Sequence, residues 1–305
     1  MERTVGVLSS HRSFQTLIRY GENTIAMLNQ TILPTIPLAA SAFEKTNQTT
    51  VCWLGSAGFL LNIHGCILLI DPVLSPAAED PLRCLDTGMS MKRRFPITAE
   101  EIPCVDYLLY THADRDHMGP NTVKTLSALE PQIYCTLFAG FRLTKYGLPP
   151  DQISFCRAGD LIQLRDGIYV EVIRADHPWQ LKDLDRFGTP YTEQDCVGFI
   201  VNTPEGRLLF PGDSRLIKEH AALGDLKLIA MDVSTDPYHM GRKSSAWLAN
   251  HYAEAILIPC HYDTYAVNEP GYNGTVEGLQ QMVIKGEERI KRLSPGAILT
   301  LKFKL

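Results

Sequence analysis

The feature that most restricts how this chain can fold is a cluster of polar residues directly after an apolar run. Residues 105–110 are predicted to form a strand that ends on Leu-Leu-Tyr, and residues 112–117 then read His-Ala-Asp-Arg-Asp-His. Imidazole nitrogens and carboxylate oxygens are both ligands of divalent cations. In a loop that follows a strand, the side chains of alternate residues can point to the same side. Asp116 and His117 enter the next helix, so their side chains can turn toward a second position. The pattern predicts a metal centre at the end of a strand.

Four more polar residues follow predicted strands elsewhere in the chain. They are Asp71, His177, Asp213 and His261. Taken singly, such a residue is more often a helix N-cap or an ordinary loop histidine. Side chains at strand ends meet at one edge of the sheet, where layered α/β folds place their sites. Together with residues 112–117 they predict one site that several strand ends build.

Short strands and helices interleave along the chain, which indicates a layered α/β architecture. Helical spacing over residues 13–29 is followed by Pro34 and Pro37, which would end a helix. We predict a partly helical N-terminal extension over residues 1–48 and one domain over residues 49–305, because the strand-end residues span the latter. Strands are expected at 50–54, 58–63, 66–70, 105–110, 132–135, 153–156, 161–164, 168–174, 196–203, 207–211, 227–231, 255–259 and 297–303, and helices at 120–129, 138–146, 216–222, 243–253 and 275–292.

Composition narrows the classes of protein further. The 29 Lys and Arg against 34 Asp and Glu leave a net charge of −5, which disfavours nucleic acid as a partner. The eight cysteines contain no C-x-x-C pair, which favours reduced thiols and a cytoplasmic location. Residues 51–70 carry no charged side chain and reach the length of a membrane span, but Gly55, Gly58 and the pair His64-Gly65 favour strands joined by a tight turn. No membrane span is expected.

The order of the strand-end residues resembles the metallo-β-lactamase superfamily. Its pattern is an early Asp, then H-x-H-x-D-H, then a lone His, a lone Asp and a lone His, and the match covers about residues 50–265. The resemblance implies an α/β fold, a four-layer αβ/βα sandwich of two mixed β-sheets flanked by helices, with residues 49–305 as the catalytic domain. Residues 52–59, 212–214 and 258–263 also look like the L-ascorbate-6-phosphate lactonase-like branch. Lactonases of that branch are cytoplasmic and manganese-dependent, and related members are phosphodiesterases acting on N-acyl phospholipids.

The resemblance also implies a role for each strand-end residue. Asp114 stands where the pattern has its second histidine, and this carboxylate would shift metal preference from zinc toward manganese or iron. It could also weaken one metal position, or pair with Arg115 instead of a metal. The implied sets are His112, Asp114 and His177 for one metal, Asp116, His117 and His261 for the other, Asp213 as the bridge, and Asp71 to orient a ligand histidine.

These implications lead to an expected function with open alternatives. We expect a metal-dependent hydrolase in which two divalent ions, manganese or zinc with iron as a further option, activate a water to cleave a small, anionic ester or lactone. A phosphodiesterase acting on phospholipid, cyclic nucleotide or RNA, or a non-catalytic metal-binding relative, is the alternative. The expected partner is a small-molecule substrate. The resemblance also leaves open that the protein forms a homo-oligomer. The predicted catalytic residues are Asp116, Asp213 and His239, and Trp179, Arg215, Tyr262 and Lys243 are substrate candidates by sequence adjacency.

Overall fold

A computed structural model describes residues 32–188, 191–267 and 271–302. The predicted helix over 13–29 lies outside these residues. A compact unit spans Thr35–Leu305, so it begins before the predicted boundary at residue 49. The short 3₁₀ helix Ala40–Phe43 buries Phe43, and Asn62 Nδ2 donates to the carbonyl oxygens of Ala42 at 2.9 Å and Glu44 at 2.7 Å. This part of the predicted extension therefore packs against the first β-sheet.

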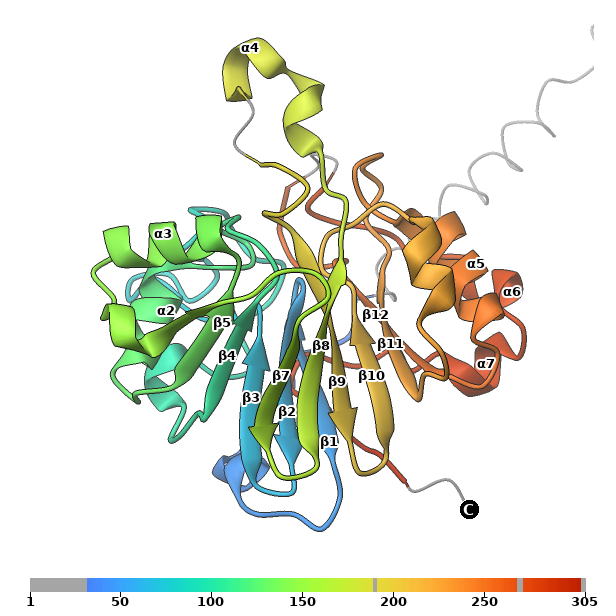
Figure 1. The fold of residues 1–305 in the computed structure, drawn as a ribbon, viewed down its shortest axis with the longest axis horizontal. Helices are drawn as coiled ribbons and strands as arrows, with labels where there is room; N and C mark the ends of the chain where they lie inside the picture. The colour runs from blue at the N-terminus through green and yellow to red at the C-terminus, as the bar shows by residue number, and fades with distance from the viewer. Residues whose placement is uncertain (1–31, 189–190, 268–270, 303–305) are drawn as a thin grey trace, which may run out of the picture. The chain divides into compact units, whose positions relative to one another are not determined.

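Two mixed β-sheets flanked by helices make up this unit, which confirms the predicted fold class (Figure 1). Within the described residues, the first sheet has the order β13 (Ile298–Thr300), β1 (Thr50–Gly55), β2 (Gly58–Ile63), β3 (Cys66–Ile70), β4 (Tyr107–Tyr110), β5 (Gln132–Cys135) and β6 (Ile153–Phe155). The second has the order β12 (Ile256–Cys260), β11 (Leu228–Asp232), β10 (Gly206–Phe210), β9 (Val197–Thr203), β8 (Ile168–Arg174) and β7 (Leu161–Arg165). Strands β3 to β6 run parallel, as do β10 to β12, and the other neighbours run antiparallel.

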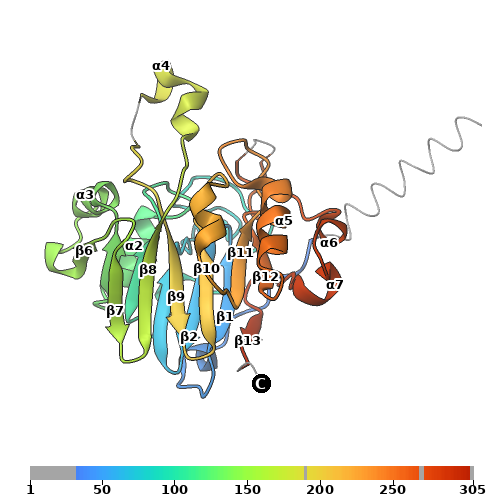
Figure 2. The same ribbon diagram turned by 45° about the vertical axis from the view of Figure 1, so that its right-hand side comes forward.

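Helices cover the outer faces of both sheets (Figure 1, Figure 2). The first sheet is covered by α2 (Pro120–Ser127) and α3 (Leu137–Lys145), and the second by α5 (Gly241–His251), α6 (Leu279–Met282) and α7 (Gly286–Arg289). Shorter helical turns are η2 (Ala99–Glu101), η3 (Pro150–Gln152), η4 (Trp179–Lys182), α4 (Leu184–Phe187) and η5 (Lys218–Ala222).

The main core lies between the two sheets. Every residue of β2 and β3 is buried, which explains why residues 51–70 read as an unbroken uncharged run. Phe59 of β2 meets Phe210 of β10 edge to face, with ring centroids 5.1 Å apart. Burying one such side chain contributes about 1.5–3 kcal/mol. All eight cysteines are free thiols, and none of the described helices is long and apolar enough to cross a membrane.

The predicted helix over residues 275–292 is wrong. The chain forms the two short helices α6 and α7 there, and residues 283–285 interrupt them. Lys285 has the left-handed φ of 53°, which an α-helix cannot contain. A Cβ atom on Gly286 would lie 2.2 Å from the Gln280 carbonyl oxygen, so this glycine allows a close return of the chain. The predicted helix at 216–222 is the 3₁₀ turn η5.

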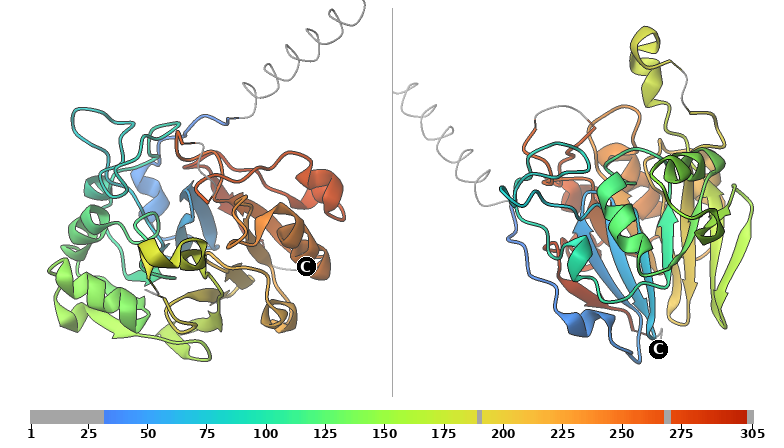
Figure 3. Two further views of the ribbon diagram at one scale, coloured as in Figure 1. Left: turned by 90° about the horizontal axis from the view of Figure 1, so that it is seen from above. Right: turned by 90° about the vertical axis from the view of Figure 1, so that its left-hand side faces the viewer.

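Strand direction brings polar residues from both sheets to one edge. Asp71 follows β3, Asp213 lies three residues after β10, and His261 directly follows β12. His112 lies two residues beyond β4, which is parallel to β3. The left view of Figure 3 looks down onto this edge, and the right view shows α4 beyond the loops that follow the strands.

Candidate metal centre

Asp213 is the centre of the polar cluster at this edge. Its carboxylate is almost fully buried, and the Nε2 atoms of five histidines surround it. The preceding residue, Gly212, has a φ of +64°, and a Cβ atom there would lie 2.8 Å from Thr111 Cβ. A glycine is therefore needed to bring Asp213 this close to the loop after β4. Oδ2 lies 3.0 Å from His117, 3.5 Å from His239, 3.8 Å from His177 and 3.9 Å from His112, and Oδ1 lies 3.5 Å from His261.

Several of these atoms are suited to bind divalent cations because they lack a hydrogen-bond partner. Among the described residues, His112 Nε2, His117 Nε2, His261 Nε2 and Asp213 Oδ1 are buried without a hydrogen-bond partner. Burying such atoms is unfavourable unless something binds them. Three groups of potential ligand atoms lie within 4.8 Å of one another: Asp116, His117, Asp213 and His261; His112, His177 and Asp213; and Asp232, His239 and His261. The first two correspond to the implied metal sets, apart from Asp114.

Asp114 lies beside the second of these groups. Its Oδ2 is 3.4 Å from His112 Nε2 and 3.7 Å from His177 Nε2. Its Oδ1 accepts a hydrogen bond from the Tyr191 hydroxyl. Burial raises the pKa of Asp114, but the hydrogen bonds and charges of the two histidines lower it by more. The net pKa is therefore below the ordinary value. Among the described residues, no ion pair joins Arg115 to this carboxylate, and Arg115 is exposed to the cleft.

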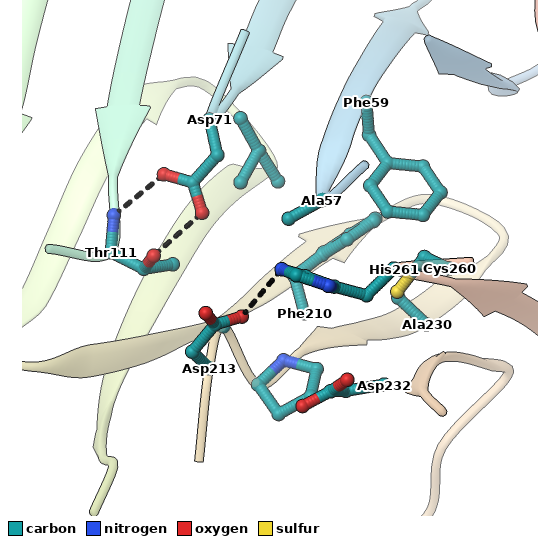
Figure 4. A pocket seen from close by; sticks show the side chains of 13 residues that line it. Ala57, Phe59, Asp71, Thr111, Phe210, Asp213, Ala230, Asp232, Cys260 and His261 are labelled. Carbon is teal, nitrogen blue, oxygen red and sulfur yellow. Dashed lines mark hydrogen bonds and ion pairs between the residues drawn. The ribbon is translucent and has the colours of Figure 1, made fainter. Parts of the chain in front are cut away.

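Asp71 holds the loop after β4 in place. Its Oδ1 accepts from the Thr111 backbone N–H at 2.8 Å, and its Oδ2 accepts from the Thr111 hydroxyl at 2.6 Å (Figure 4). The same Oδ2 lies 2.9 Å from His117 Nδ1. A proton on Nδ1 donated to Asp71 leaves the Nε2 lone pair directed at Asp213. This is the orienting geometry that the resemblance implies for Asp71.

A second carboxylate–histidine pair at this site was missed in the sequence. Asp232 is the last residue of β11, and its Oδ2 lies 2.9 Å from His239 Nδ1. Burial raises the pKa of Asp232, and the charge of His239 lowers it more, so the net pKa is below the ordinary value. Asp232 ends an apolar strand in the same way that Asp71 and Asp213 follow theirs, and this signal could have identified it.

The charges of the cluster stabilise one another. Burial raises the pKa of Asp213, but the surrounding histidines, His117 first, lower it to well below its ordinary value. For His117, burial lowers the pKa, while the charges of Asp213 and then Asp71 raise it to well above the ordinary value. For His261, burial also lowers the pKa, and Asp213 is the main cause of its net rise to about 9. In the metal-free cluster, protons therefore occupy positions that cations would take.

A cleft of about 810 Å³ opens onto the cluster. Its lining includes five residues of the cluster, Asp114, Asp116, His177, Asp213 and His239, and the aromatic side chain of Trp179. A second cavity of about 10 Å³ lies beneath Asp213 and His261, with room for about one water (Figure 4). The remaining lining residues of the large cleft are Thr87, Met89, Arg115, Lys182, Arg186, Asp236, Val267, Gly271 and Tyr272.

The other three substrate candidates lie elsewhere in the described part of the chain, outside the cleft lining. Arg215 forms an ion pair with Asp176, with Nη2 2.7 Å from Oδ2. Tyr262 is buried and stacks on Trp53, with ring centroids 5.0 Å apart. Lys243 is exposed in the first turn of α5.

Fold and site together define a protein of the αβ/βα class that carries a histidine- and aspartate-rich candidate metal centre at a sheet edge. Residues 67–262, more than half of the chain, match the family model of the beta-lactamase superfamily domain. The chain belongs to this superfamily.

Known proteins similar to the chain agree with this assignment. The chain is 27% identical over 275 residues to a UPF0173 metal-dependent hydrolase of Thermodesulfovibrio yellowstonii, which covers 86% of this chain and 94% of that protein. A solved structure of a possible metal-dependent hydrolase from Veillonella parvula has a TM-score of 0.63 at 18% identity, covering 83% of this chain and all of that one. CmlA, a diiron β-hydroxylase from Streptomyces venezuelae, has a TM-score of 0.56 at 16% identity, covering 85% of this chain and 55% of that one. The expected superfamily and the general class of metal-dependent hydrolase are confirmed, whereas the lactonase branch stays a prediction.

Proposed function

We propose that the protein hydrolyses a small, anionic ester or lactone with the help of two divalent cations bound around Asp213. The single observation that supports this most is that one buried carboxylate lies 3.0–3.9 Å from the Nε2 atoms of five histidines. Burying ligand-type atoms of this cluster without a hydrogen-bond partner is costly unless cations bind them. Bound cations would lower the pKa of a water toward neutrality and polarise the oxygen of the bond to be cleaved.

The ligands would form two sets that share Asp213. His112, His177 and Asp114 would hold one cation, and Asp116, His117 and His261 the other. Three carboxylates in the combined set favour a hard cation, so manganese or iron fits better than zinc. Asp71 would keep His117 in the tautomer whose Nε2 is free to bind.

His239 is the proposed proton donor to the leaving group. Its Nδ1 is held by Asp232, and the residue lines the cleft with Nε2 3.5 Å from Asp213 Oδ2. A histidine held in this way can carry a proton on Nε2 and release it to a departing oxygen. No serine or cysteine nucleophile is required.

The cationic side chains in the cleft lining support an anionic substrate. Arg115, Lys182 and Arg186 line the cleft, together with the carboxylates of the proposed metal ligands and of Asp236. Lys182 Nζ is 3.9 Å from Asp236 Oδ2, a separation that leaves the ammonium group able to bind a ligand as well. Guanidinium groups suit phosphate or carboxylate, which they can bind through two parallel hydrogen bonds. Trp179, which also lines the cleft, would contact the apolar part of the substrate.

The test combines metal content with activity. Freshly purified protein should contain about two divalent cations per chain, a chelator should abolish hydrolysis, and added manganese should restore it. A panel of lactones, phosphodiesters and amides identifies the bond, and faster cleavage of phosphodiesters would favour the alternative function. Asp213→Asn should lose metal and activity together, whereas Asp151→Asn, at an exposed position of η3 before β6, should lose neither. Full activity of the metal-free protein would exclude the proposal.

The proposed setting is the cytoplasm. Eight free thiols, seven of them buried, suit a reducing compartment. The predicted homo-oligomer belongs to the same proposal and can be checked by light scattering of the purified protein.

A further inference from the structure

The carboxylate of Asp114, at a position where the superfamily pattern has a histidine, faces two different surroundings. Oδ2 faces the ring nitrogens of His112 and His177 at 3.4 and 3.7 Å. Oδ1 accepts a hydrogen bond from the Tyr191 hydroxyl on the opposite side. One oxygen thus faces the predicted metal ligands, and a neutral donor holds the other.

Tyr191, which lies between β8 and β9, is held in place by Phe138 of α3 and by Trp179 and Gln180 of η4. Its side chain is 5% exposed, and its ring meets those of Phe138 and Trp179 edge to face, at centroid distances of 5.4 and 6.0 Å. Gln180 Nε2 donates to the Tyr191 carbonyl oxygen at 3.0 Å. Aromatic packing and a backbone hydrogen bond therefore set the position of the phenol before any metal binds.

We propose that Tyr191 is a positioning residue that makes Asp114 a one-oxygen metal ligand in the place of an imidazole. A carboxylate can bind a cation through both oxygens, whereas an imidazole contributes one nitrogen. Because the phenol occupies Oδ1, Oδ2 alone faces the centre. The pair keeps the ligand count that a histidine provides but supplies a hard oxygen, which favours manganese or iron over zinc.

This inference rests on the proposed metal-dependent function, and its test measures metal affinity instead of turnover. Metal-free full-length protein is titrated by calorimetry with Mn²⁺ alone and with Zn²⁺ alone. Tyr191→Phe keeps the ring and removes only the hydroxyl. Outer partners of metal ligands change affinity by about 10–100-fold, so we expect a loss of that size for Mn²⁺ and a smaller loss for Zn²⁺.

Tyr107→Phe is the matched control. The Tyr107 hydroxyl donates to the Leu164 carbonyl oxygen at 2.6 Å, at the end of β4 remote from the cluster. This variant also loses one phenol hydrogen bond, but both metal affinities should stay at the wild-type values.

A double-mutant cycle with Asp114→His tests whether Tyr191 acts on metal affinity directly through Asp114 or through a general effect on the site. Histidine has no second oxygen for the phenol to hold, so Tyr191→Phe should change affinity by less than about twofold in that background. Equal losses in both backgrounds, or an unchanged ratio of Mn²⁺ to Zn²⁺ affinity in Tyr191→Phe alone, would overturn the inference and leave the proposed hydrolysis intact. Wild-type protein that binds neither cation would overturn the proposed function and this inference with it.

Discussion

At the scale of single residues, Asp71 is placed to orient His117, a proposed metal ligand, from the side away from Asp213. It accepts three hydrogen bonds, two from Thr111 and one from His117 Nδ1. Asp71→Asn keeps the shape and tolerates the left-handed backbone at this position, where φ is 46°. It replaces one acceptor oxygen with a donor that opposes the proton on His117. We expect metal affinity to fall by about 10–100-fold, as measured by chelator competition.

Asp86→Asn controls for the general cost of altering a buried carboxylate. Asp86 accepts from the Asn121 backbone at 2.6 Å and from the Thr122 hydroxyl at 2.5 Å, at the start of α2. This variant should lower thermal stability but leave metal affinity unchanged. Equal loss of affinity in both variants would show that Asp71 acts through folding alone.

Asp232 is expected to influence the chemical step. Asp232→Asn would weaken the hold on His239 Nδ1 and remove the negative charge that balances the doubly protonated imidazole ring, which is the form that can donate a proton from Nε2 while Nδ1 stays bonded. General acid catalysis is worth about 10²–10⁴-fold, so we expect kcat to fall by about tenfold or more on the substrate that the panel identifies, with little change in KM or metal content. A loss of metal instead of kcat would assign His239 and Asp232 to a metal position, as the third ligand group allows.

At the scale of elements, Arg289 of α7 ties together the end of α5 and the strand that follows. Its guanidinium donates to four backbone carbonyl oxygens at 2.7–3.0 Å, those of Ala249, Tyr252, Ala255 and Ile284. Arg289→Ala should lower the free energy of unfolding by about 3 kcal/mol in urea denaturation, because charge-assisted hydrogen bonds to four backbone carbonyls are lost. Arg289→Lys should recover little, since an ammonium cannot span four acceptors. Arg157→Ala, an exposed control, should change stability by less than about 0.5 kcal/mol.

The same elements show what the sequence could and could not predict. The strands were readable because β2 and β3 are buried on both faces and so appear as unbroken apolar runs. The helix predicted over residues 275–292 was wrong because the apolar residues there have a helical spacing, whereas the chain turns at Lys285 and Gly286. Tyr191 could not be found at all, because only the folded chain brings its hydroxyl to Asp114, 77 residues away in the sequence. Asp232 was readable in principle, as an acidic residue that ends an apolar strand.

At the scale of the whole molecule, the site joins the two halves of the sandwich. Asp71 and His117 come from the edge of the first sheet, and Asp213 and His261 from that of the second. Their ion pairs and any bound cations therefore link the two sheets, so the state of the centre should affect the stability of the entire unit. Part of the formal charge of −5 lies in these carboxylates, and bound cations would compensate for it.

This coupling predicts opposite pH responses for metal-free and metal-loaded protein. The pKa of His261, which burial lowers and Asp213 raises, is about 9 in the folded protein against an ordinary value of 6.5. A raised pKa stabilises the folded state fully below pH 6.5, and this contribution is lost as pH rises through 9. The lowered pKa of Asp213 stabilises the folded state at every pH above the ordinary pKa of an aspartate. This stabilisation is lost only in strong acid. Chelator-treated protein should therefore lose stability from pH 6.5 to 9, by about 3 kcal/mol from His261 alone.

Metal-loaded protein should gain stability over the same range, because cations bind the deprotonated ligands. Differential scanning calorimetry at each pH, with chelator and with excess Mn²⁺, would show the two melting temperatures moving apart. His261→Gln should flatten the metal-free curve, whereas His251→Gln, at the exposed end of α5, should keep the wild-type slope. If the metal-free protein were as stable at pH 9 as at pH 6, His117, His177 and His261 would not be held by Asp213 through their charge, and the cluster would have to be stabilised by packing instead.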